Sequence, residues 1–194
     1  IKATSAATVT GTAAEIIAAF GNSTITEATN VAITVNSGTA SLSQARTIDG
    51  YTTGVVTATI ADTRVSDLVG SSPLLDANGN NAFTVTIGTA DAEITAANLT
   101  TLNGLTSVAI EAGNVTKITG TVAATNTVYA AAGNSEINGL GNEAVVISGE
   151  SSNTLSDAST LNTLDGYTTG TVNAGSLTTI KGDVSDLLLS LIHI

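Results

Sequence analysis

A long internal repeat is the feature that most constrains how this chain can fold. When the sequence is shifted against itself, residues 99–122 align with residues 161–184 without a gap. An earlier copy, TIDGYTTG at residues 47–54, differs from TLDGYTTG at residues 163–170 at one position. The three copies start from the equivalent positions Thr47, Thr101 and Thr163. Their spacing, roughly 54 to 62 residues, indicates stacked supersecondary units that pack on their neighbours.

Recurring N-cap residues predict two helices in each unit. Thr12 and Glu15 form a capping-box pattern, which satisfies free N–H groups of a first helical turn. The inner face of that helix is expected to carry Ala13, Ile16, Ile17 and Phe20. The equivalent caps are Thr63, Thr121 and Asp183 for the first helix, and Ser41, Thr95 and Asp157 for the second. The second helix is expected to end at Gly50, Gly104 or Gly166, because glycine accepts the left-handed conformation common at helix ends.

β-rich runs are expected between the helices. After the first helix and a Gly/Asn break, they cover residues 31–35, 83–87 and 144–147, and after the second helix residues 55–60, 108–118 and 172–180. Half a unit is about 27 to 31 residues, which allows one strand and one short helix. This pattern predicts an α/β repeat solenoid in which parallel strands alternate with short capped helices in a right-handed superhelix. A parallel β-helix, in which the helices are only turns, is the alternative.

The repeat also sets the expected domain organisation. The array is predicted to span residues 1–187, in units of about 1–54, 55–107 and 108–170 and a partial unit at 171–187. Residues 188–194 break the pattern, and their ending LSLIHI resembles translated sequencing-adapter read-through, so they are interpreted as a non-native tail. Because the chain begins in mid-unit, a targeting segment would lie outside it.

Composition narrows the possible functions. Hydrophobic residues make up 42% of the chain but aromatics only 3%, which suits thin layers of Ala, Val, Ile and Leu. The net charge is −11 with five Lys and Arg in total, which argues against nucleic-acid binding. Cysteine and methionine are absent, which is consistent with an oxidising, extracellular setting. No long apolar run is present that would predict a membrane span.

The sequence assigns no catalytic, cofactor-binding or metal-binding residue, and the chain is predicted not to be an enzyme. His193 is the only histidine and lies in the suspected tail, so a catalytic triad or histidine metal site has little support. A carboxylate pair of the glycosidase type has as candidates Asp49, Asp62, Asp67, Asp165, Asp183 and Asp186. Asp49 and Asp165 precede the glycines expected to end a helix, which favours a turn-forming role for both.

Calcium binding and glycan binding are the two alternatives to this structural interpretation. Calcium suits an acidic repeat, but the Gly-rich nonapeptide and the EF-hand loop are missing. The acidic pairs Asp183/Asp186 and Asp91/Glu93 do not recur in every unit. Tyr51 and Tyr167 share one repeat position, which Leu105 occupies in the middle copy. Leucine at this position predicts a buried apolar slot and not an exposed platform for stacking sugars.

The segment LNTLDGYTTGTVNAGSLTTIKGDVSDL, together with INGLGNEAVVISG at residues 137–149, resembles the repeat arrays of giant secreted cell-surface proteins of marine cyanobacteria, including the type associated with swimming motility. The resemblance implies an extracellular, surface-attached protein and supplies no catalytic residues. We therefore expect a structural or adhesive spacer whose partners are adjacent repeats and, as a further candidate, cell-surface glycans. A calcium- or glycan-binding surface module is the alternative, and a carbohydrate-active enzyme is a weaker one.

Overall fold

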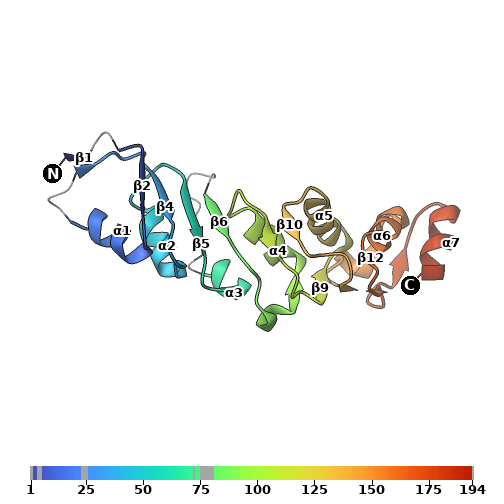
Figure 1. Cartoon of the computed structure of the whole chain (residues 1–194). Coiled ribbons are helices and arrows are strands. Elements are labelled where there is room, and N and C mark those ends of the chain that lie inside the picture. Colours follow the sequence, from blue (N-terminus) through green and yellow to red (C-terminus); the bar gives the residue numbers. More distant parts are fainter. Residues whose placement is uncertain (1, 4–5, 23–25, 72, 75–80, 194) are drawn as a thin grey trace. The chain divides into compact units, whose positions relative to one another are not determined.

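The computed structural model describes residues 2–3, 6–22, 26–71, 73–74 and 81–193 (Figure 1). The chain forms two compact units. The N-terminal unit comprises residues 1–86 and 101–110, and the C-terminal unit residues 87–100 and 111–194. In both units, helices alternate with short parallel strands, so the fold is mixed α/β.

The N-terminal unit is built on a four-stranded parallel sheet in the order β2-β4-β5-β6, with β1 and β3 forming a separate pair. Its elements are β1 (Lys2–Ala3), β2 (Thr8–Gly11), α1 (Ala13–Phe20), β3 (Thr26–Glu27), β4 (Ala32–Val35), α2 (Leu42–Asp49), β5 (Val56–Thr59), α3 (Val65–Leu68) and β6 (Ala82–Thr84). Helices α1 and α2 pack against each other.

The C-terminal unit contains a second four-stranded parallel sheet in the order β13-β11-β9-β7, and the two-stranded sheets β10-β8 and β12-β14. The boundary between the units falls within α4 and β8. The elements are η1 (Thr89–Asp91), β7 (Glu93–Thr95), α4 (Ala96–Asn103), β8 (Ile110–Glu111), β9 (Lys117–Gly120), α5 (Val122–Gly133), β10 (Ile137–Asn138), β11 (Ala144–Ile147), η2 (Ser151–Asn153), β12 (Thr154–Leu155), α6 (Ala158–Asp165), β13 (Val172–Asn173), β14 (Thr179–Ile180) and α7 (Val184–His193). Helix α6 packs against both α5 and α7.

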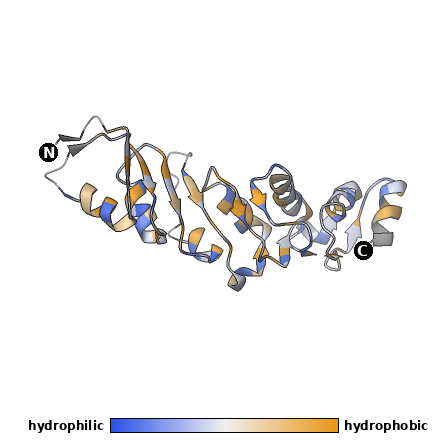
Figure 2. Cartoon of the chain, viewed as in Figure 1, coloured by the Kyte–Doolittle hydropathy of each residue, from blue (hydrophilic) through white to orange (hydrophobic). Residues whose placement is uncertain are grey.

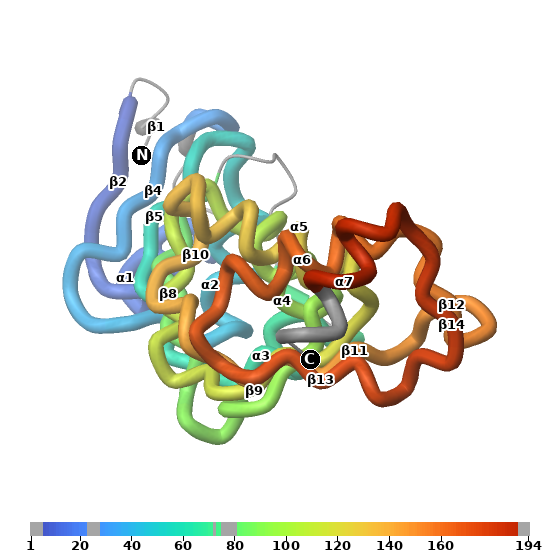
Figure 3. The backbone as a smooth tube through the Cα atoms, turned by 90° about the vertical axis from the view of Figure 1, so that its right-hand side faces the viewer, coloured from blue at the N-terminus to red at the C-terminus, as the bar shows by residue number. Residues whose placement is uncertain are grey.

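Strand pairing follows a regular step along the chain. Val9 pairs with Ile33, and Ile33 in turn pairs with Val56. In the C-terminal unit, the steps from β7 to β9, from β9 to β11 and from β11 to β13 are similar in length. Each step covers roughly 23 to 27 residues, a length typical of repeats that stack on their neighbours. Figure 3 shows β9, β11 and β13 lying side by side in successive loops of the backbone. We call each such step, from one strand to the strand that pairs with it, a coil.

The core of each unit is a row of apolar side chains, one from each coil. In the C-terminal unit the residues in register are Ile94, Ile118, Val145 and Val172, and all four are buried. In the N-terminal unit Ile33 and Val56 form the equivalent row. Hydrophobic residues therefore occur on strands and helices throughout both units (Figure 2). This arrangement confirms the expectation that Ala, Val, Ile and Leu would be buried in narrow layers.

Most of the predicted helix caps are confirmed. Capping boxes join Thr12 to Glu15 at α1 and Ser41 to Gln44 at α2. Thr95, Thr121 and Asp157 each accept a backbone N–H of the helix that follows, and α7 begins directly after Asp183. The prediction for Thr63 is wrong. Helix α3 begins at Val65 after Arg64, which makes no side-chain cap bond, and it is only four residues long.

The predicted helix ends are in the right place but for a different reason. Helices α2, α4 and α6 end directly before Gly50, Gly104 and Gly166. Gly50 and Gly166, however, are right-handed, with φ of −66° and −69°. Their N–H groups bond back to carbonyls of the last helical turn, Arg46 O and Asn162 O among them, so no left-handed residue is needed. The expectation of a left-handed glycine is therefore wrong at both positions.

The predicted strands are confirmed in part. The run at residues 144–147 is β11, while those at 31–35, 55–60 and 83–87 contain the shorter strands β4, β5 and β6, of which β6 begins one residue earlier. The long runs at 108–118 and 172–180 each divide into two short strands of different sheets. In the later part of the chain, two strands therefore precede a helix where one was expected. The break expected at residues 78–80 lies outside the described residues.

Candidate functional site

The recurring YTTG segment binds the preceding coil, and it does so identically in two copies. Thr52 donates its hydroxyl to Val31 O at 2.5 Å and accepts the Gly54 N–H at 2.9 Å. Thr168 donates to Glu143 O at 2.7 Å and accepts the Gly170 N–H at 3.0 Å. We call residues 51–54 and 167–170 the YTTG clamps. Each clamp fixes the chain to the start of the strand one coil earlier.

The last residue of the clamp must be glycine because the two backbones approach closely there. A Cβ atom at Gly54 would lie 2.6 Å from Val31 O and 2.7 Å from Asn30 O. At Gly170 it would lie 2.8 Å from Asn142 O and would overlap Glu143 O. Real Cβ atoms do not approach carbonyl oxygens this closely, so no other side chain fits without movement of the backbone.

The middle copy carries Val108 where the others carry glycine, and its contacts are displaced by two residues. Thr106 donates to Phe83 O at 2.8 Å, and Ser107 donates its N–H to Asn81 O at 2.8 Å. By alignment with the other two copies, Thr106 would reach Asn81 O. The valine side chain cannot enter the narrow space that the glycines occupy, which accounts for the displacement.

Asp49, a candidate catalytic carboxylate, is instead part of a buried structural network. Its Oδ1 accepts the Asn81 side-chain N–H at 2.6 Å, and Asn81 Oδ1 accepts the Val56 N–H at 2.8 Å. Both side chains are buried. The interpretation of Asp49 as structural is thus favoured, although its partner Asn81 lies in a later coil and not in a local turn.

Glu143 is a fully buried carboxylate that sequence reasoning did not identify. It accepts the Tyr129 hydroxyl at 3.0 Å and the Gly141 N–H at 2.8 Å. Burial is the main cause that raises the pKa of Tyr129 above its usual value, and the negative charge of Glu143 adds to it. The hydroxyl therefore stays protonated and remains a donor to the carboxylate.

The sequence contains a signal for this position. Strands β4, β6 and β11 each begin at the last residue of a similar triplet: Asn30-Val31-Ala32, Asn80-Asn81-Ala82 and Asn142-Glu143-Ala144. The middle residue of each triplet is buried in all three copies. The apolar Val31 indicates that this position is buried. The equivalent Asn81 and Glu143 are then buried polar groups, which need hydrogen-bond partners.

Each YTTG clamp also carries a stacked aromatic pair. Tyr51 stacks on Phe20 with ring centroids 5.3 Å apart, and Tyr167 stacks on Tyr129 at 5.7 Å. Phe20 and Tyr129 are both the eighth residue of their helix. Tyr167 is nevertheless 41% exposed, so the prediction of a buried slot is wrong for this residue. Stacking covers one face of its ring and leaves the rest accessible.

Two helices donate their first backbone N–H to a carboxylate of the following coil. Asp62 Oδ2 accepts the N–H of Leu42, the first residue of α2, at 2.6 Å. Glu150 Oε1 accepts the N–H of Val122, the first residue of α5, at 2.7 Å. A helix N-terminus favours a carboxylate because its N–H groups and its dipole are unsatisfied. The candidate Asp62 therefore joins two coils.

Asparagines join successive helices in the C-terminal unit. Asn126 donates its side-chain N–H to Thr160 O at 2.9 Å, and Asn162 donates to Asp186 O at 3.1 Å. Both asparagines are the fifth residue of their helix, and both acceptors are the third residue of the next helix. The contact between α5 and α6 is thus repeated between α6 and α7.

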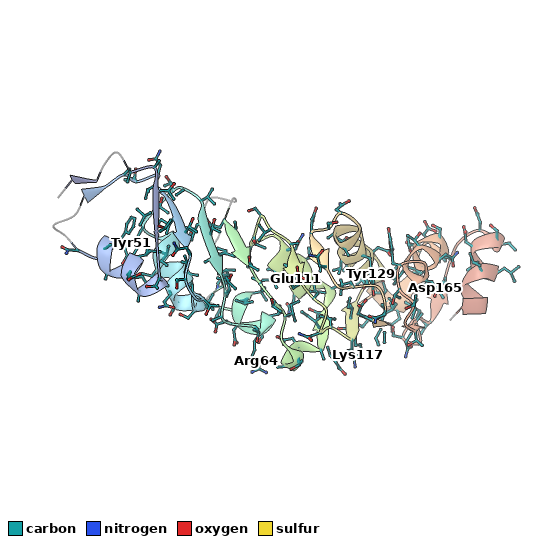
Figure 4. All side chains as sticks on the ribbon, viewed as in Figure 1. Tyr51, Arg64, Glu111, Lys117, Tyr129 and Asp165 are labelled. Carbon is teal, nitrogen blue, oxygen red and sulfur yellow. The ribbon has the colours of Figure 1, made fainter. Side chains whose placement is uncertain are left out.

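The remaining acidic candidates do not converge on a site. Glu93 forms an ion pair with Lys117 at 2.6 Å, and Asp67 accepts the Ser66 hydroxyl at 3.4 Å. Within the described residues, no three His, Cys, Asp or Glu side chains are grouped so that they could hold a metal ion. Figure 4 shows Lys117, Tyr129 and Asp165 at separate places in the C-terminal unit. Asp183 directly precedes α7 and Asp186 lies in its first turn, while the side chain of His193 lies outside the described part of the chain.

No family model, curated protein or solved structure matches this chain. Among the helices that the structure describes, none has the length and apolar character needed to cross a membrane. The contacts of the recurring Thr52 and Thr168 are directed at a neighbouring coil.

Proposed function

We propose that this chain is a structural or adhesive spacer segment of a large exported cell-surface repeat protein, and that it is not an enzyme. The observation that carries the proposal is that polar side chains bond to neighbouring coils. The recurring Thr52 and Thr168 do so, and so do the carboxylates of Asp62 and Glu150. The resemblance to cyanobacterial surface-protein repeats supports an extracellular location.

In this proposal the coils continue through the chain as a right-handed α/β solenoid, and the role is mechanical. Each coil is joined to the next by backbone pairing, by a clamp or cap bond and by apolar contact. Stacked repeats of this kind provide length and stiffness that grow with the number of coils. The net charge of −11 keeps separate chains soluble and apart.

Thermal unfolding in chelator, in millimolar calcium and in millimolar magnesium tests this function. A ligand that binds only the folded chain raises the apparent stability. The spacer proposal expects coincident unfolding curves, because the acidic candidates are bonded within the fold or separate from one another. A rise of several degrees in calcium but not in magnesium would instead favour the calcium-binding alternative.

A glycan-binding surface is the second candidate, and the exposure of Tyr167 favours it. An accessible aromatic ring held rigidly by a stacked partner is a suitable surface for the apolar face of a sugar. Binding of the chain to an array of bacterial surface glycans, and its loss in Tyr167→Ala, would support this candidate. Equal binding by Tyr167→Ala would remove Tyr167 from it, and absence of binding to every glycan would leave the spacer role without an adhesive component.

A further inference from the structure

Tyrosine is the most easily oxidised side chain that this chain contains, and two of its three tyrosines are in contact. The sequence holds no cysteine, methionine or tryptophan, the other side chains that one-electron oxidants attack readily. Tyr129 and Tyr167 stack with ring centroids 5.7 Å apart and ring planes 12° apart. The third tyrosine, Tyr51, stacks on Phe20. An oxidant that acts on the C-terminal unit therefore acts on a pair of phenols.

The two rings of this pair differ in their access to solvent. Tyr129 lies on α5 and is 3% exposed, while Tyr167 begins the second YTTG clamp, in the following coil, and is 41% exposed. A soluble oxidant therefore reaches Tyr167 directly. Tyr129 is oxidised when it passes an electron to Tyr167 across the stacked contact, so Tyr167 is the point at which oxidation enters the pair.

Glu143 is placed to accept the proton of Tyr129. The Tyr129 hydroxyl donates to Glu143 Oε2 at 3.0 Å, and both side chains are buried. Burial raises the pKa of Tyr129, so the hydroxyl does not lose its proton by itself. Loss of an electron, however, makes a phenol strongly acidic, and a carboxylate within hydrogen-bond distance accepts the proton without movement of the chain. The electron and the proton of Tyr129 therefore leave together.

We propose that Tyr129 and Tyr167 form an oxidative crosslink, a dityrosine that joins α5 covalently to the YTTG clamp of the following coil. The new bond connects two ring carbons, each next to the carbon that bears the hydroxyl. Stacking holds the rings in contact, and the exposed Tyr167 ring has room to tilt as the bond forms. The inference goes beyond the spacer role, because it adds a reaction and a covalent bond between coils.

The oxidant is hydrogen peroxide acting through a haem peroxidase, which removes one electron at a time. The first oxidation takes an electron from Tyr167, and its hydroxyl proton passes to water. Tyr129 then returns an electron to Tyr167, which regains a proton from water, and Tyr129 gives its own proton to Glu143. A second oxidation of Tyr167 leaves a phenoxyl radical on each ring, and the two radicals couple. The ring hydrogens at the new bond move to the oxygens and restore both phenols. The electrons and protons that leave the pair reduce hydrogen peroxide to water.

Phe20 and Tyr51 provide a matched pair in the N-terminal unit. Their stacking is equivalent to that of Tyr129 and Tyr167, since Phe20 and Tyr129 are both the eighth residue of their helix. Phenylalanine has no hydroxyl and forms no phenoxyl radical, so this pair should not crosslink.

Peroxide and peroxidase treatment of the full chain at low micromolar concentration is the test. The monomer is separated from dimers in denaturant, and its dityrosine is measured by fluorescence and located by mass spectrometry of the joined peptides. We expect a link between the peptides that contain Tyr129 and Tyr167. Tyr167→Phe keeps the stacked ring and should lose this link, whereas Tyr51→Phe, the same substitution in the other clamp, should retain it. Glu143→Gln, whose amide is a poor proton acceptor, should form the link several-fold more slowly.

The crosslinked monomer should also unfold at a higher urea concentration than the untreated chain, because a covalent link between coils restricts the unfolded state. A wild-type monomer without dityrosine would overturn the proposal, and so would a Tyr167→Phe monomer with as much dityrosine as the wild type. Dityrosine confined to dimers would overturn it as well, since exposed rings would then couple between chains and the stacked pair would not. An unchanged rate in Glu143→Gln would remove Glu143 as the proton acceptor. None of these readouts depends on export or on a ligand, so they are independent of the spacer role.

Discussion

Gly166 and Gly170 lie in the same motif, yet they have different roles. A Cβ at Gly166 would meet no atom closer than 3.4 Å, whereas a Cβ at Gly170 would overlap the backbone of the preceding coil. Gly170 therefore permits a close approach between coils, while Gly166 only follows the end of α6. The same contrast holds between Gly50 and Gly54 in the first clamp.

Gly170→Ala should lower the free energy of unfolding by about 1–3 kcal/mol, the usual cost of forcing extra volume into a packed site. Gly166→Ala should leave stability unchanged or raise it by about 0.4–1 kcal/mol, because alanine adopts the right-handed conformation and restricts the unfolded chain. Urea denaturation of both variants measures the difference. Equal stability of the two would contradict the assigned role of Gly170.

Tyr129→Phe should destabilise the fold by about 1–3 kcal/mol, because Glu143 loses a donor while it stays buried. The variant should also change the pH dependence. The pKa of Tyr129 is raised in the folded state, so its contribution to stability is fully present below about pH 10, the unfolded value, and is lost as the pH rises further. Wild-type stability should thus fall more steeply than that of Tyr129→Phe between about pH 10 and pH 11.5.

At the scale of single elements, helix starts are governed by both local and distant groups. Thr12, Ser41 and Thr121 cap their own helices, and local sequence was sufficient to predict them. Asp62 and Glu150 cap helices of the preceding coil. Thr63 does not cap a helix. The residue before it is Asp62, whereas the equivalent positions in two other copies are the glycines Gly11 and Gly120. The Asp62 carboxylate bonds to the first residue of α2.

Asp62→Ala should destabilise the chain by about 0.5–2 kcal/mol, as expected for loss of a helix cap. Asp67→Ala is the matched control, because the carboxylate of Asp67 bonds to the hydroxyl of its exposed neighbour Ser66, and it should change stability by less than about 0.5 kcal/mol. Circular dichroism during guanidinium titration compares the two. If both variants unfold at the wild-type midpoint, the bond from Asp62 to Leu42 makes no contribution.

Helix α1 should respond to acid through its capping box. The pKa of Glu15 is lowered because its carboxylate accepts the Thr12 backbone N–H and then the Thr12 hydroxyl. A lowered pKa gives stability that is present above the unfolded value and lost as the pH falls through the folded one. Stability should therefore drop on acidification below about pH 4.5, and Glu15→Gln should show a smaller drop. Equal acid profiles of the two proteins would exclude this contribution.

Sequence reasoning succeeded for helix caps and alternating strands because these depend on residues within one turn or one strand. It failed where the partner lies in another coil. Asn81 and Glu143 resemble loop residues in sequence, and contacts with residues distant in sequence, such as Asp49 and Tyr129, satisfy them in the interior. The division of residues 108–118 into β8 and β9 has the same cause, since each strand pairs in a different sheet.

At the scale of the whole molecule, stability should vary with position in the sheets. Strands β4, β5, β9 and β11 are paired on both sides, whereas β2 and β13 are outer strands. Amide hydrogen exchange at low protein concentration should therefore be slowest in the inner strands and faster in β2 and β13. Uniform protection would indicate one cooperative core and contradict coil-by-coil organisation.

The displaced contacts of Thr106 and Ser107 also bear on how the gene for such a repeat can change in length. Because side chains alternate between the two faces of a strand, a displacement of two residues leaves each side chain on its original face, whereas a displacement of one turns the buried row outward. A shift of the clamp along its partner strand therefore keeps the fold when it covers an even number of residues. The length of a coil is not limited in this way, since the steps from Ile94 to Ile118 and from Ile118 to Val145 differ by an odd number of residues and all three side chains are buried.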